Sequence, residues 1–160
     1  MAAREDQQNA TKGSPPDLSA PLRVAALAAE LLERACEPGA GDLLRLEIVR
    51  TLARDLTEEL KTLAVMADRM GMVEGALRAA DVANLAACTA PELLQAHAME
   101  AAAAAHLAAG AARALCALAG ASFIDAPGEY AQNALKDVRG AVWRAQLAAR
   151  QVDEFLGETF

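Results

Sequence analysis

Apolar residues recur at the three- and four-residue spacing of an amphipathic helix in five segments of this chain, several of them separated by glycine or proline. The first segment begins at Ser19, a residue type that can cap a helix start, and Glu-Pro-Gly-Ala-Gly at 37–41 ends it. Its apolar stripe consists of Val24, Leu27, Leu31 and Ala35. We therefore expect a short first helix.

The second segment predicts a much longer helix, which starts at a cap on Asp42 and stops at Gly71. Its expected apolar seam consists of Val49, Leu52, Leu56, Leu60 or Leu63, Met66 and Met70. A third helix is expected over about 72–88. Its less regular stripe consists of Val73, Leu77, Ala80, Asn84 and Cys88.

Two further helices are predicted in the second half of the chain. Thr-Ala-Pro-Glu at 89–92 matches a capping box, which predicts a helix from there to Gly120. From Ala101 onward this helix is apolar on nearly all sides, so we expect it to lie at the centre of the fold. The last segment has a coiled-coil-like seam with steps of three and four, made of Leu135, Val138, Val142, Ala145, Ala149, Val152 and Leu156.

Composition supports an all-α reading. Alanine makes up about a quarter of the chain, and leucine adds to this pool of strong helix formers, whereas β-branched residues are few. We predict an up-and-down bundle of about four to five helices, formed as a single domain by residues 19–160. Residues 1–18 lack apolar periodicity, and we expect them to be a flexible tail.

Charge and cysteine usage narrow the possible partners and compartment. A net charge of −7 disfavours nucleic acid as a partner, because phosphate backbones are bound by clustered Lys and Arg. The apolar stretch 101–120 contains His106 and Arg113, so we expect a buried helix and no membrane partner. The chain start shows no apolar run of signal-peptide length, and Cys36, Cys88 and Cys116 are widely spaced. We therefore expect a cytoplasmic protein with reduced core thiols.

Two carboxylate pairs have a spacing that could serve a divalent cation. Glu30 and Glu33 stand three positions apart on the first predicted helix, as do Asp55 and Glu58 on the second. The arrangement resembles the all-α nucleoside triphosphate pyrophosphatases, whose signature is Glu-x-x-Glu followed by Glu-x-x-Asp on the next helix; here the second pair stands in reverse order. The resemblance implies Mg²⁺-dependent pyrophosphate hydrolysis by these four residues. The alternative is a solvated acidic face with local ion pairs, for example to Lys61.

The two histidines do not predict a metal centre. His97 and His106 lie on opposite faces of one predicted helix, and neither belongs to a Glu-x-x-His pair of the di-iron type. We therefore predict no metal site and no cofactor. Mg²⁺ would be required only by the hydrolase alternative. His106 and Arg113 share one face of an apolar helix. They either form structural hydrogen bonds, with Asp81 as a plausible partner of Arg113, or hold a small anionic ligand.

The aromatic residues gather late in the chain and are candidates for an interface. They are Phe123, Tyr130, Trp143 and Phe155. Trp143 points about 100° away from the seam of the last helix, and tryptophan and tyrosine are favoured interface anchors. The leading prediction is therefore a non-catalytic interaction or assembly module, homodimeric through the last helix. The alternatives are the Mg²⁺-dependent hydrolase and a bundle that binds a small anion near His106 and Arg113.

Overall fold

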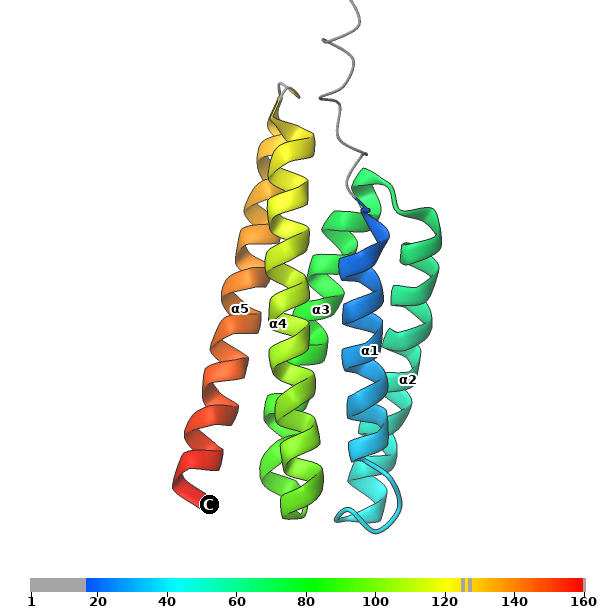
Figure 1. The fold of residues 1–160 in the computed structure, drawn as a ribbon, viewed down its shortest axis with the longest axis vertical. Coiled ribbons are helices and arrows are strands. Elements are labelled where there is room, and N and C mark those ends of the chain that lie inside the picture. The colour runs from blue at the N-terminus through cyan, green and yellow to red at the C-terminus, as the bar shows by residue number, and fades with distance from the viewer. Residues whose placement is uncertain (1–16, 125, 127, 160) are drawn as a thin grey trace, which may run out of the picture.

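The computed structural model describes residues 17–124, 126 and 128–159, and within them the chain forms five helices and no strand. The helices run up and down in sequence order, which confirms the all-α bundle (Figure 1). They are α1 (Ser19–Ala35), α2 (Leu43–Met66), α3 (Arg69–Thr89), α4 (Gln95–Phe123) and α5 (Glu129–Thr159), with a 3₁₀ turn at Ala90–Glu92. Most of the expected tail lies outside the described residues. Leu18 packs against the core, and Asp17 accepts hydrogen bonds from Ser19 and Arg23, so these two residues join the bundle.

Helices α3 and α4 form the centre of the bundle. Helix α4 packs against α1, α3 and α5, as its all-round apolar sequence predicted, and α3 contacts each of the other four helices. In Figure 1, α1 and α2 lie on one side of this central pair and α5 lies on the other. By length and composition α4 could also cross a membrane, but buried core helices of soluble proteins meet the same criterion and half of its most apolar window is buried.

The core is built mainly from alanine, with a few larger side chains between the helices. Leu22, Leu60, Met72 and Leu115 are fully buried in the cluster near the N-terminal end of α1. A second cluster at the opposite end contains Leu32, Leu46, Leu93 and Val152. Small side chains allow helix axes to approach closely. Gly75 marks one such approach, because an added Cβ would collide with the side chain of Leu22.

The stripe predicted for α1 is correct at its C-terminal end, where Ala35 is fully buried and Leu31 packs against the second cluster, and wrong at its start. Val24 and Leu27 are 37% and 50% exposed, whereas Leu22 and Leu32 are fully buried. The buried face between those two leucines consists of alanines at 25, 26, 28 and 29. Alanine is common both in the core and on the surface of helices, so the sequence pattern does not show which alanines are buried. The buried face of α1 was therefore predicted from its larger apolar residues, two of which are exposed.

The boundary between α2 and α3 also differs from the prediction. Helix α2 ends at Met66, where Ala67 adopts a left-handed conformation with φ of 42° and its N–H donates to Leu63 O. Asp68 then caps α3 by accepting a hydrogen bond from Gly71 N at 2.6 Å. Gly71 therefore lies in the first turn of α3 and does not end α2. The left-handed position that usually favours glycine is filled here by an alanine.

The predicted capping box at 89–92 does not form. Thr89 belongs to α3 and donates its hydroxyl to Leu85 O, while the Glu92 carboxylate lies 2.9 Å from Arg45. Helix α4 begins at Gln95 and continues through Gly120 to Phe123. In α5, by contrast, the seam is confirmed, with Val138 and Val152 among its buried residues.

Candidate functional site

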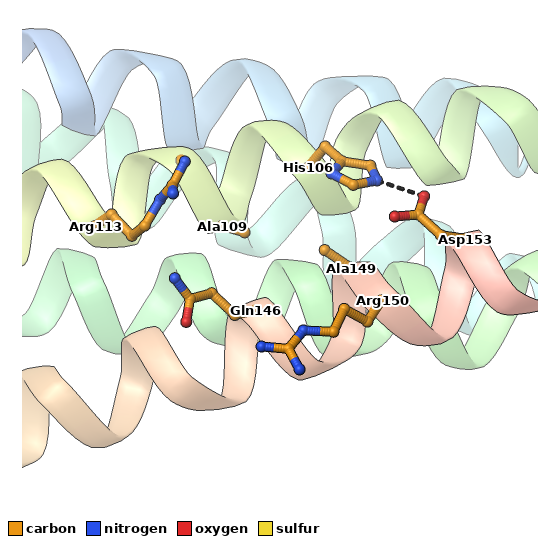
Figure 2. A pocket seen from close by; sticks show the side chains of 8 residues that line it. His106, Ala109, Arg113, Gln146, Ala149, Arg150 and Asp153 are labelled. Atoms are coloured by element: carbon orange, nitrogen blue, oxygen red, sulfur yellow. Dashed lines mark hydrogen bonds and ion pairs between the residues drawn. The ribbon is translucent and has the colours of Figure 1, made fainter.

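A groove between α4 and α5 is the best candidate for a binding site. It has a volume of about 260 Å³. Its lining is His106, Ala109, Gly110 and Arg113 from α4, and Gln146, Ala149, Arg150 and Asp153 from α5. The small residues at 109, 110 and 149 leave room between the helices, and the polar side chains stand along the rims (Figure 2).

One end of the groove is closed by a contact between the two helices. His106 Nε2 lies 2.7 Å from Asp153 Oδ1, within hydrogen-bond distance, and both side chains are about half exposed. The prediction that His106 makes a structural hydrogen bond is confirmed. Its side chain is half exposed, on the solvent side of the α4–α5 contact.

The rest of the groove is cationic. Arg113 and Arg150 both line it, and neither forms an ion pair with another described residue. The expected partner of Arg113 is wrong, since Asp81 instead lies 3.3 Å from Arg78 and 3.9 Å from Arg144. Two free guanidinium groups in one groove offer the planar donor sets that suit carboxylate or phosphate oxygens.

Three of the four carboxylates of the hydrolase hypothesis lie beside basic side chains of α2. Glu33 Oε1 accepts from Nε and Nη2 of Arg54, at 2.9 and 2.8 Å. Glu30 lies 2.6 Å from Lys61 Nζ, and this hydrogen bond raises the Lys61 pKa. Both carboxylates of the α1 pair are thus engaged by cations of α2.

The α2 pair does not complete a metal site with them. Glu58 lies 4.0 Å from Lys61, and Asp55 lines a different groove, between α2 and α3. Among the residues that the structure describes, no three His, Cys, Asp or Glu side chains are placed to hold a metal ion. The convergence that the hydrolase hypothesis requires is therefore not present in this structure.

The four aromatic candidates occupy different environments. Trp143 and Tyr130 are 66% and 62% exposed, and the Tyr130 hydroxyl donates to the sulfur of Met70. Phe155 is half-buried and packs against the second core cluster. Phe123 is buried in the core, with the Arg69 guanidinium carbon 5.9 Å from its ring centroid. Phe123 thus belongs to the interior and does not contribute a free interface surface.

Sequence reasoning found the α4 half of the groove and missed the α5 half. His106 and Arg113 could be paired by their spacing on one helix, but Gln146, Arg150 and Asp153 meet them only through the packing of α5 on α4. The one available signal for the α5 half was the presence of polar residues in a helix that has a regular apolar seam.

Comparisons with protein-family models, with curated proteins and with solved structures found no match for this chain.

Proposed function

We propose that this chain is a non-catalytic assembly module that associates with a second copy of itself through the outer face of α5. The observation that carries this proposal is the exposure of Trp143 and Leu147, at 66% and 39%, four positions apart on one helix. The opposite face of α5 already packs into the bundle through its seam. A second apolar surface on the same helix is more than a simple surface helix needs, and tryptophan is a favoured interface anchor.

The proposal also includes the cellular location of the protein and the kind of partner it binds. We infer a cytoplasmic protein whose partner is a protein surface, a second copy first, with no cofactor. The net charge of −7 supports this choice over nucleic acid, because the electrostatic contribution to phosphate-backbone binding would be unfavourable.

Self-association can be tested with the only tryptophan of the chain as a reporter. We expect native mass spectrometry and light scattering to give a dimer at micromolar concentrations, and the Trp143 emission to shift to the blue as concentration rises. Trp143→Ala should weaken the dimer at least tenfold. Leu27→Ala removes a half-exposed apolar side chain from α1 and should leave the dimer intact. A 16.6 kDa monomer at every concentration tested would refute the proposal.

A second candidate function is anion binding in the α4–α5 groove. It is favoured by Arg113 and Arg150, which line one groove without ion pairs to described residues, next to the amide of Gln146. Together these side chains provide donors to a carboxylate or phosphate group, and Asp153 is the one carboxylate in the lining.

Anion binding can be tested by titrating the protein with inorganic phosphate and, separately, with succinate, while the amide chemical shifts are measured at each concentration. We expect saturable shifts at residues of the groove, abolished in an Arg113→Gln, Arg150→Gln double variant. Arg139→Gln is the matched control, because Arg139 lies on α5 outside the groove and is exposed. If the control variant loses the shift changes to the same extent, or if the shifts do not saturate, the anion is attracted by general charge and does not bind in the groove.

A further inference from the structure

A second groove runs between α2 and α3 and has a different chemical character. Its lining includes Leu52, Asp55, Leu56 and Glu59 from α2 and Leu85 from α3, around a volume of about 360 Å³. A second hollow of about 360 Å³ continues it, lined by further α2 residues and by Glu74 of α3. Glu59 lines both, so the two hollows form one surface, which we call the α2–α3 groove.

The α2–α3 groove is apolar in part of its lining. Leu52 is 47% exposed, and Leu56, Leu63 and Leu85 are half-buried around it. Ile48 stands one helical turn before Leu52 on α2 and is 58% exposed, so the apolar surface extends beyond the groove itself. Ile48 and Leu52 thus form a contiguous exposed apolar surface and are not isolated single side chains.

The rim of the same groove is acidic. Its five carboxylates are Asp55, Glu58, Glu59, Glu74 and Asp81. The guanidinium of Arg78 forms ion pairs with three of them, at 2.8 Å from Glu59, 2.7 Å from Glu74 and 3.3 Å from Asp81.

Two other cations reach only the edges of this surface. They are Lys61, at 4.0 Å from Glu58, and Arg144, at 3.9 Å from Asp81. Asp55 has no ion-pair partner among the described residues. The groove therefore keeps a negative excess beside the exposed Leu52 and its half-buried leucine neighbours.

The outer face of α5 has the complementary pattern. Lys136 and Arg139 flank Trp143 and Leu147 on this face, all four side chains are exposed, and the two cations form no ion pair with described residues. At 1.5 Å per residue, positions 136 to 147 span about 17 Å, as do positions 52 to 63 of the groove. The basic apolar face and the acidic apolar groove are thus matched in charge, in apolar content and in length.

We infer that the α2–α3 groove receives the outer face of α5 from a second copy of this chain. This inference rests on the proposed self-association and names the surface that the partner copy contributes. Trp143 and Leu147 would cover Leu52 and Leu56, and the α5 cations would face the carboxylates of the rim. The contact between Arg144 and Asp81 places α5 beside the groove of its own chain. Two copies can therefore make the contact reciprocally about a twofold axis.

Complementary charge reversal tests this pairing directly. Asp55→Lys changes the groove, and Arg139→Glu changes the α5 face; both sites are exposed and without ion pairs to described residues, so circular dichroism should show unchanged folding. We expect each variant alone to dissociate at least tenfold more readily than the natural dimer. When the two variants are mixed, native mass spectrometry should show a heterodimer in excess over both homodimers, because opposite charges meet again at the altered contact. Glu37→Lys makes the same kind of charge change in the exposed loop after α1 and should not weaken the dimer.

The outcomes separate the two proposals. If the natural chain dimerises but both reversals are without effect, or their mixture gives only a statistical distribution, the groove assignment is wrong and self-association stands. Dimer loss in Trp143→Ala without loss in Asp55→Lys would show that α5 pairs with something other than the groove, such as the α5 of the partner copy. If the natural chain is a monomer throughout, both proposals fail.

Discussion

His106 and Asp153 join α4 to α5 through a contact of 2.7 Å between Nε2 and Oδ1, across 47 positions of sequence. Because both side chains are about half exposed, the contact contributes little to stability. Its position at the end of a groove that also contains Arg113 and Arg150 gives it a second effect, since Asp153 places a negative charge beside two cations.

Asp153→Asn should therefore separate stability from binding. We expect the Tm to fall by less than about 4 °C, the change for roughly 1 kcal/mol in a chain of this size. Affinity for phosphate should rise about threefold, because a charge that repels the ligand is removed at an exposed site. Thermal unfolding and a phosphate titration measure the two effects. A weaker affinity would contradict the repulsive role assigned to Asp153.

Ala104→Leu tests how tightly α4 is packed. Ala104 is fully buried, so the larger side chain should overpack the core and lower the unfolding free energy by about 1–3 kcal/mol. Ala103→Leu is a matched control, because Ala103 is the preceding residue of the same helix and is exposed. Urea unfolding of the two variants should differ by that amount. Equal stability would contradict the central position of α4.

The existence of the five helices could be predicted, because alanine and leucine set the local preference over most of the chain. Their ends were harder. A predicted stop at Gly71 failed because Ala67 accepts the left-handed conformation and Asp68 provides a new cap. The predicted capping box failed because Glu92 pairs with Arg45 of α2, a contact made only after the helices assemble.

The candidate site was predictable only where it lies on one helix. Helical spacing relates His106 to Arg113 without knowledge of the fold. Arg150 and Asp153 join them only through the packing of α5 on α4. The buried residues of both helices are mostly alanines, which carry no distinctive signal in the sequence. For the same reason the sequence could name Asp81 only as a plausible partner of Arg113; in the structure Asp81 lies beside Arg78 and Arg144 instead.

Substitution by alanine should change the stability of the protein in opposite directions at two helical glycines. At Gly140 an added Cβ meets nothing within 4 Å, so Gly140→Ala should stabilise the protein by about 0.5–1 kcal/mol through helix propensity. At Gly75 the Cβ would collide with the fully buried Leu22 and touch Leu115 at 3.4 Å, so Gly75→Ala should destabilise despite the same propensity gain. Thermal melts of the two variants check the signs. A stabilised Gly75→Ala would show that Leu22 has room to move.

The thiols should differ in reactivity according to burial. Cys36 is 3% exposed, whereas Cys88 is exposed and Cys116 is half-buried, so the expectation of core thiols is correct for Cys36 and wrong for Cys88. We expect a thiol reagent at pH 8 to modify Cys88 rapidly and Cys36 only on unfolding. Cys88→Ser should remove the fast phase.

Burial of Cys36 should also make stability depend on pH in the alkaline range. Desolvation raises the pKa of the Cys36 thiol from 9.0 to about 11, against a smaller opposing effect of Arg50. Below pH 9 the thiol is protonated in both the folded and the unfolded chain, and its contribution to stability is fully present. Between pH 9 and 11 the unfolded chain loses this proton first, so the unfolding free energy should fall by about 1.4 kcal/mol for each pH unit. Urea unfolding at pH 8, 9.5 and 10.5 measures the slope, and Cys36→Ala should flatten it while leaving the contribution of lysines such as Lys61 unchanged. An identical slope in Cys36→Ala would assign the alkaline loss of stability to the lysines alone.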